Sequence, residues 1–273
     1  MGDRQGRYMS HDQSEGSVRS ADGTQVGFLK LGSGPAIVFV HGSLTTGEQW
    51  LPVASGLAEG FTCYLMDRRG RGRSGDSQDY SLSKECEDIK SLLDVAGSGA
   101  CLLGHSYGAI CALEAANRQP VPKLVLYEPP LPIQHSVIGP AFDDVRAAVA
   151  KNDLDAALTI GLRDMVRVSA SELGELKESA LWSAMAALTP TWVRECEVMA
   201  RLEFGVERFA GMTTPTLLLL GTATAAHHIE ASRALERTLP KVRSAEFNGE
   251  SHFAHLTATG QVVSTVSRFV RED

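Results

Sequence analysis

The stretch Gly104-His105-Ser106-Tyr107-Gly108 follows the apolar run Ala100-Cys101-Leu102-Leu103 and opens a helical pattern that continues to Gln119. A strand, a five-residue turn and a helix in this order are typical of a nucleophile elbow, in which the serine is strained and its hydroxyl stands clear of the backbone. Glycines are expected at both ends because a side chain there would strike the adjoining strand or helix. The amides that begin the helix point toward negative charge forming above Ser106. The stretch therefore predicts a nucleophilic serine.

Apolar runs bounded by turns recur on both sides of the elbow. They cover residues 36–40, 61–66, 123–127 and 216–220, and helical patterns separate several of them. Continuous apolar strands are typical of a parallel sheet that is buried on both faces. The predicted fold class is therefore α/β, with a mostly parallel, doubly wound sheet.

The alternation of strand and helix stops between residues 131 and 211, where only helical patterns occur, at 142–150, 154–168, 173–188 and 192–209. We expect an all-helical cap inserted into the α/β core. The first residues are polar and carry both charges, which is typical of a loose terminus. The predicted organisation is a flexible tail at 1–16, a core at 17–130 and 212–273, and a cap at 131–211.

Polar residues follow several of the predicted strands directly. His41-Gly42-Ser43 follows strand 36–40, Glu128 follows strand 123–127, and His252 lies in the turn after the last strand. Open α/β sheets bind ligands outside the carboxyl ends of their strands. Gly42 allows a sharp turn that can aim the Ser43 amide at Ser106, and Pro129 favours an extended Glu128. We expect all these residues at one edge of the sheet.

This combination resembles the α/β-hydrolase superfamily with a helical cap, from about Ser17 onward. The resemblance rests on four motifs in the expected order: His41-Gly42, the elbow, Glu128-Pro129-Pro130 and Gly249-Glu250-Ser251-His252. It implies that Ser106 is the nucleophile, that His252 is the general base, and that the amides of Ser43 and Tyr107 form the oxyanion hole. Haloalkane dehalogenases and epoxide hydrolases carry aspartate at the elbow, so a serine argues against their chemistry.

The acid of the triad departs from the usual pattern of this superfamily. Many relatives carry an aspartate shortly after the strand that corresponds to residues 216–220, where this chain has Thr224. Some relatives instead carry the acid at the end of the preceding strand, the position of Glu128. Glu230 is the alternative, but it already lies within a predicted helix. Both glutamates keep the order serine, acid, histidine, and we favour Glu128 because of its place on the ligand edge.

The resemblance implies a serine hydrolase that cleaves a carboxylic ester or lactone of a small to medium, mostly apolar substrate through an acyl-enzyme. The same residues would serve a carbon–carbon bond hydrolase, a thioesterase or a cyclase of a biosynthetic pathway. A ligand-binding receptor with little turnover on the same fold also remains open, because the usual aspartate is missing.

The remaining histidines and the arginine-rich loop favour structural roles. His255 is a competing base, and His105 is expected to point into the protein. No metal or organic cofactor is expected, because the tandem His227-His228 lacks a third ligand. The loop 67–75 holds four arginines without the spacing of a phosphate-binding loop, so we expect Asp67 to pair with a neighbouring arginine or with backbone amides.

Composition narrows the range of partners. A net charge of −7 argues against nucleic acid or an anionic membrane surface. No apolar run is long enough to span a bilayer, and no secretory signal is visible. Five cysteines without metal spacing indicate reduced thiols in a cytoplasmic protein. The expected partner is a small-molecule substrate; the oligomeric state is left open, with a homodimer as one option.

Overall fold

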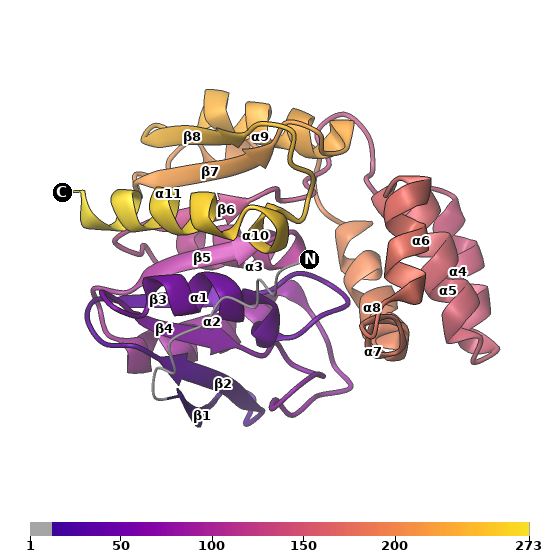
Figure 1. Cartoon of the computed structure of the whole chain (residues 1–273), viewed down its shortest axis with the longest axis horizontal. Coiled ribbons are helices and arrows are strands. Elements are labelled where there is room, and N and C mark those ends of the chain that lie inside the picture. Colours follow the sequence, from indigo (N-terminus) through magenta and orange to yellow (C-terminus); the bar gives the residue numbers. More distant parts are fainter. Residues whose placement is uncertain (1–12, 273) are drawn as a thin grey trace, which may run out of the picture.

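The computed structural model describes residues 13–272 and contains one eight-stranded sheet in the order β1-β2-β4-β3-β5-β6-β7-β8 (Figure 1). β2 runs antiparallel to β1 and β4, and all pairs from β4 to β8 are parallel. The predicted α/β class with a mostly parallel, doubly wound sheet is confirmed. The strands are β1 (Gln13–Arg19), β2 (Gln25–Leu31), β3 (Ala36–Val40), β4 (Thr62–Met66), β5 (Cys101–His105), β6 (Leu124–Tyr127), β7 (Thr216–Gly221) and β8 (Val242–Phe247).

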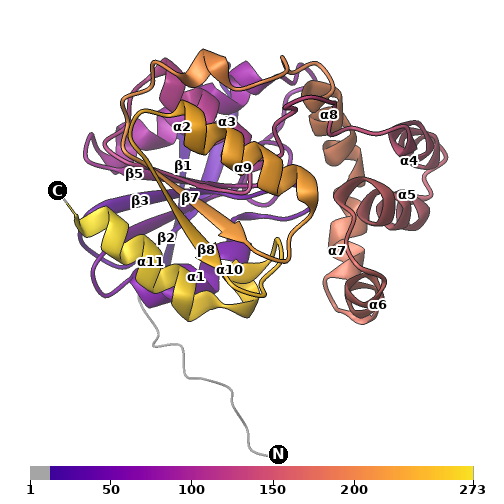
Figure 2. The same ribbon diagram turned by 90° about the horizontal axis from the view of Figure 1, so that it is seen from above.

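Helices cover both faces of this sheet. Figure 2 shows α1 and α11 on one face and α2, α3 and α9 on the other. Successive strand residues point to opposite faces, so Val38 and Val40 join the core under α2 and α3, whereas Ile37 and Phe39 join the core under α1 and α11. These helices are α1 (Leu51–Leu57), α2 (Leu82–Ala96), α3 (Tyr107–Arg118), α9 (Ala226–Thr238), α10 (Ala254–Thr257) and α11 (Thr259–Arg271).

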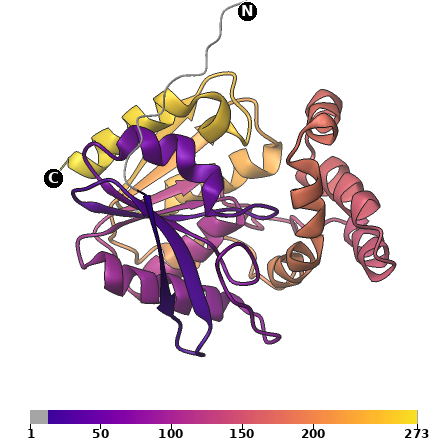
Figure 3. The same cartoon turned by 60° about the horizontal axis from the view of Figure 1, so that its bottom comes forward.

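The helical segment, residues 131–211, leaves the sheet after β6 and returns to it at β7. Figures 1 and 3 show its helices beyond the ends of the strands, with α8 on the side nearer the sheet. It contains α4 (Ala141–Ala150), α5 (Leu154–Ile160), a π-helical turn (Gly161–Val166), α6 (Ala170–Glu178), α7 (Trp182–Ala187) and α8 (Thr189–Met199). The division of the chain into core and cap stays a prediction.

Three predicted helices of this segment are shorter in the structure. The helix expected at 192–209 ends with α8 at Met199, and only a 3-10 turn at Glu207–Phe209 follows it. The helix expected at 154–168 ends in the π-helical turn, because Arg167 adopts a left-handed backbone with φ 64°. The helix expected at 173–188 is two helices, because the chain leaves the helix at Ser179, whose backbone is extended. Ser169 and Glu172 form a capping box that starts α6 earlier than predicted.

The predicted tail at 1–16 is wrong for its last four residues. Residues 13–16 belong to β1, which pairs with β2 from Gln13 opposite Leu31 to Arg19 opposite Gln25. Their side chains are mostly exposed, so backbone hydrogen bonds rather than an apolar pattern define this edge strand. Residues 1–12 lie outside the described part of the chain. Within residues 13–272 no helix has the length and apolar character needed to cross a bilayer.

Candidate active site

The elbow has the strained geometry that its sequence predicted. Ser106 lies between β5 and α3 with φ 55° and ψ −127°, a backbone conformation that costs a residue with a side chain on the order of 1–3 kcal/mol. A Cβ at Gly104 would lie 2.4 Å from the carbonyl oxygen of Gly108, and a Cβ at Gly108 would lie 2.3 Å from that of His41. Only glycine therefore fits at these two positions.

The loop after β3 lies against the elbow because the strand order reverses there. β3 pairs with β4 on one side and with β5 on the other, and Val40 is opposite Gly104. A Cβ at Gly42 would lie 3.0 Å from the Cβ of Ser106. Gly42, the residue before Ser43, therefore packs directly against Ser106. No hydrogen bond recorded within residues 13–272 uses the amide of Ser43 or of Tyr107. Both amides are therefore unoccupied donors close to Ser106.

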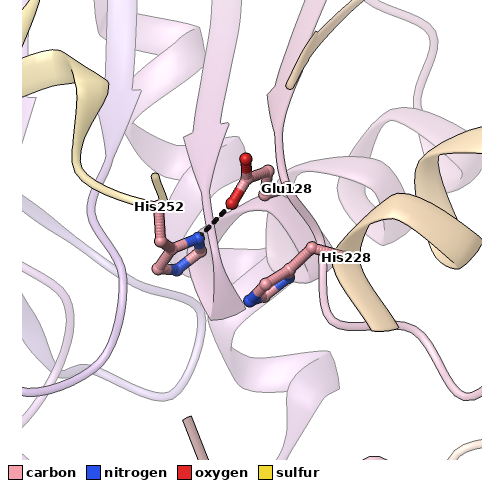
Figure 4. A group of neighbouring side chains, drawn as sticks. All are labelled: Glu128, His228 and His252. Atoms are coloured by element: carbon pink, nitrogen blue, oxygen red, sulfur yellow. Dashed lines mark hydrogen bonds and ion pairs between the residues drawn. The ribbon is translucent and has the colours of Figure 1, made fainter. Parts of the chain in front are cut away.

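Glu128 and His252 come together at the same edge of the sheet (Figure 4). His252 Nδ1 lies 2.5 Å from Glu128 Oε2, and the carboxylate is fully buried. Glu128 also accepts hydrogen bonds from the amide of Gly221 at 2.7 Å and from the hydroxyl of Thr224 at 2.7 Å. Glu230, the alternative acid, is exposed on α9, and no recorded hydrogen bond in the described chain joins it to His252.

The backbone of Glu128 differs from the extended conformation predicted from Pro129. Its φ is +48°, so the chain turns out of the line of β6 at this residue. Its carboxylate accepts three hydrogen bonds, from Gly221 in β7, from Thr224 in the loop after β7 and from His252, and these fix the position of the side chain. Tertiary contacts thus override the local preference that proline imposes.

Ser106 is linked to His252 through its neighbour His105. The Nε2 of His105 lies 3.1 Å from the carbonyl oxygen of His252, and the two rings are 4.5 Å apart. No hydrogen bond between Ser106 Oγ and His252 is recorded among the described residues, and neither Ser106 Oγ nor His252 Nε2 is among the buried atoms that lack a partner. Catalytic hydrogen bonds of this kind commonly tighten only in the substrate complex.

The chain matches the model of the alpha/beta hydrolase family over residues 37–265. This protein belongs to that family. The resemblance predicted from the sequence is therefore confirmed over more than half of the chain.

Two curated proteins are similar to parts of this alpha/beta hydrolase. An N-formylmaleamate deformylase from Pseudomonas putida is 34% identical over 154 aligned residues, and the match covers 48% of this chain and 58% of that protein. Bifunctional epoxide hydrolase 2 from Sus scrofa is 32% identical over 102 aligned residues, and the match covers 36% of this chain and 18% of that protein. The matches thus span less than two thirds of either relative.

Solved structures are similar over almost the whole chain. An alpha/beta hydrolase from Sphaerobacter thermophilus is 31% identical with a TM-score of 0.84, and the match covers 93% of this chain and 99% of that one. The esterase RhEst1 from Rhodococcus sp. is 21% identical with a TM-score of 0.76, and the match covers 94% and 98%. At that lower identity the second likeness shows the fold alone.

Three further histidines surround His252 in this alpha/beta hydrolase. Burial lowers the pKa of His255 to about 3, with His252 adding to the effect. The pKa of His105 and that of His228 also lie well below the ordinary value. Burial is the larger cause, and the nearby His252 is the second. His255 is 1% exposed and packs against His105 at 4.7 Å between ring centres, so this competing base is part of the core.

His228 is the member of this group that sequence reasoning undervalued. It lies in the first turn of α9, and its ring stacks on that of His252 at 4.3 Å with 13° between the planes (Figure 4). His228, His252 and Glu128 each offer one ligand atom, and these atoms lie within 4.8 Å of one another. The tandem His227-His228 was visible in the sequence, but its nearest partners come from β6 and from the loop after β8.

The side chain of Ser43 contacts a cluster of buried ion pairs. The Ser43 hydroxyl donates to Glu195 Oε2 at 2.5 Å, and Glu195 Oε1 accepts from Arg68 at 2.7 Å and from Arg71 at 2.6 Å. Burial raises the pKa of Glu195, but the positive charges of Arg68 and Arg71 outweigh it and leave that pKa below its ordinary value. Glu195 lies on α8, and no motif in the sequence marked it.

The arginine-rich loop has the structural role expected for it. Asp67 accepts hydrogen bonds from the amides of Gly47 at 2.7 Å and Arg73 at 2.8 Å. Arg69 is buried and pairs with Asp88 at 2.7 Å. The buried arginines of the loop are therefore neutralised mainly by carboxylates of other elements, namely Glu85, Asp88 and Glu195.

A small cavity of about 40 Å³ borders His252. It lies between the turn at 166–168, the loop 223–225 and the segment 251–253, and Thr224 and His228 also line it. It has room for one or a few water molecules. Both His252 and His228 therefore border space that a small solute can occupy.

Proposed function

We propose that this protein is a serine hydrolase that cleaves a carboxylic ester or lactone of a small to medium, mostly apolar substrate through an acyl-enzyme. The observation that carries the proposal is a serine in strained elbow geometry on the same sheet edge as a buried carboxylate–imidazole pair. A strained, partly buried serine has little structural purpose, and strain of this kind is typical of functional sites.

Ser106 would attack the substrate carbonyl while the Nε2 of His252 takes its proton. Glu128 holds the Nδ1 of His252, which leaves Nε2 free as the acceptor and stabilises the imidazolium that forms. The amides of Ser43 and Tyr107 would bind the oxyanion, each contributing on the order of 3 kcal/mol in the transition state. His252 then returns the proton to the leaving alcohol, and water releases the acid in a second round.

Thr224 supports Glu128 as the acid of this triad. Many members of the superfamily carry an aspartate where this chain has Thr224, and here the hydroxyl of Thr224 donates to Glu128 at 2.7 Å. Position 224 thus lies beside the carboxylate that contacts the imidazole of His252. A glutamate after β6 can replace an aspartate after β7 because β6 and β7 are adjacent and parallel.

The proposal is tested with short p-nitrophenyl esters and the Ser106→Ala variant. Loss of the nucleophile is expected to lower kcat on the order of 10⁴- to 10⁶-fold without loss of folding by circular dichroism. A fluorophosphonate probe should add covalently to Ser106 in the wild type, as seen by mass spectrometry of peptides. Undiminished turnover in Ser106→Ala would refute the serine mechanism, and ligand binding without any turnover would favour the receptor hypothesis.

Release of an N-formyl group is a second candidate reaction. It is favoured by the 34% identity with a protein named N-formylmaleamate deformylase. The same serine, histidine and oxyanion donors would serve, with an amide nitrogen as the leaving group. Comparing formate release from N-formyl amides with hydrolysis of matched esters decides between the two. Epoxide hydrolysis is disfavoured, because Ser106 stands where the epoxide hydrolases carry aspartate.

A further inference from the structure

Three buried side chains with metal-ligating atoms converge beside the elbow (Figure 4). Glu128 comes from the end of β6, His228 from the first turn of α9, and His252 from the loop after β8. One ligand atom from each lies within 4.8 Å of the others, and all three residues are buried. Zinc bonds of 2.0–2.2 Å require tetrahedral ligands about 3.3 Å apart, so small side-chain rotations would complete the site.

His228 has no function in the proposed hydrolytic mechanism, yet it is 3% exposed and its Nδ1 has no hydrogen-bond partner in the described chain. A buried polar atom without a partner costs about 1–3 kcal/mol, so its persistence calls for a ligand. The Nδ1 of His228 is an atom through which an imidazole can bind a metal ion.

The donor set selects the kind of ion. Two imidazoles and one carboxylate form the protein ligand set of several zinc sites, whereas Ca²⁺ and Mg²⁺ prefer oxygen ligands alone. The cavity of about 40 Å³ that both His228 and His252 line provides an approach and room for a water molecule as fourth ligand.

We propose that Glu128, His228 and His252 bind Zn²⁺ and that the bound ion switches the hydrolase off. The inhibitory part rests on the proposed function; the metal site itself does not. If Zn²⁺ binds His252 through Nε2, it occupies the lone pair that would accept the proton of Ser106. If it binds through Nδ1, the ring's single proton lies on Nε2, which then accepts none, and the contact with Glu128 is broken.

Zinc binding is measured by isothermal titration calorimetry with zinc sulfate alone, on wild type, His228→Gln and His135→Gln. His135 is an exposed histidine outside the site and serves as the matched control for adventitious binding. Loss of a ligand should weaken binding by at least about tenfold in His228→Gln, while His135→Gln should bind as wild type does. Co²⁺ should give the visible absorption of a tetrahedral complex, and His228→Gln should abolish it. Equal zinc affinity in wild type and His228→Gln would overturn the site.

Ser106→Ala separates the metal site from the proposed function. It retains all three ligands, so its zinc affinity should equal that of wild type even though its turnover is lost. In wild type, zinc should abolish ester hydrolysis, and a chelator should restore it. Binding that depends on His228 in a protein that hydrolyses no ester would uphold the metal site and refute the hydrolase. Normal hydrolysis at saturating, His228-dependent zinc would refute the inhibition.

Discussion

Two buried carboxylates near the elbow are held in opposite ways. Glu128 accepts hydrogen bonds from neutral donors, the amide of Gly221 and the hydroxyl of Thr224, and from the imidazole of His252. Glu195 is held by two guanidinium groups and the Ser43 hydroxyl. A carboxylate among neutral donors can stabilise a charge that forms on His252, whereas one already balanced by arginines cannot. We infer that Glu128 takes part in the reaction and that Glu195 attaches α8 to the core.

The largest expected effect comes from removing the charge of Glu128. Glu128→Gln keeps the size of the side chain and an acceptor for Gly221, but it no longer stabilises an imidazolium on His252. We expect kcat to fall on the order of 10⁴-fold with folding retained. Glu230→Gln is the matched control and should leave kcat unchanged. If only Glu230→Gln loses activity in ester hydrolysis, the assignment of the acid is wrong.

Removing the charge of Glu195 should affect stability instead. Glu195→Gln leaves Arg71 without its only ion pair in the described chain and Arg68 with one fewer. Breaking a buried pair in this way is expected to lower the free energy of unfolding by about 3–5 kcal/mol. Urea denaturation measures it, and Glu197→Gln, two residues along α8 and without a recorded ion pair, should change stability by less than about 0.5 kcal/mol. A stable variant with lost turnover would instead assign Glu195 to the chemistry.

Moving the acid from position 128 to position 224 tests whether both positions can serve the same imidazole. In Glu128→Ala, adding Thr224→Asp places a carboxylate where many relatives carry it. We expect the double variant to recover about 10- to 100-fold in kcat over Glu128→Ala, since contacting residues couple by about 0.5–3 kcal/mol. Thr224→Asn in the same background is the control without charge and should recover nothing. Equal activity of the two double variants would contradict the shared position.

A fall in pH should lower the free energy of unfolding first through the histidines around His252 and only later through the cluster of arginines and Glu195. His255 has a folded pKa of about 3 against 6.5 in the unfolded chain. Above pH 6.5 neither state binds this proton, so the full stability is present; as the pH falls toward 3 only the unfolded state binds it, and stability drops by up to about 1.4 kcal/mol per pH unit. The arginine cluster should respond at a lower pH than His255 does, because the pKa of Glu195 is 4.5 in the unfolded chain and lower in the folded protein, so only around and below that value does the unfolded chain take up its proton.

The pH effect is measured as the slope of unfolding free energy between about pH 6 and pH 4. His255→Asn should flatten this slope by close to one proton relative to wild type. His135→Asn, in an exposed loop, should leave it as in wild type. An unchanged slope in His255→Asn would mean that the buried ring is protonated in the folded protein.

The strands and the elbow could be predicted because their signals are local. The apolar run at 36–40 coincides with β3, and the strain at Ser106 follows from a glycine-flanked turn between strand and helix. Edge strand β1 was largely missed, because its side chains are exposed and its pairing with β2 leaves no apolar pattern. The positive φ of Glu128 was missed because it depends on contacts with β7 and the loop that follows.

The sequence alone determined the sheet, the strained serine and which residues stand at the carboxyl ends of the strands, since periodicity and turn chemistry act between near neighbours. Only the tertiary structure decided that Glu128 rather than Glu230 contacts His252, that His228 stacks beside it, and that Glu195 reaches Ser43 from α8. The physical reason is distance along the chain. These contacts join residues roughly a hundred or more positions apart, or on separate elements, and only strand order and helix packing bring them together.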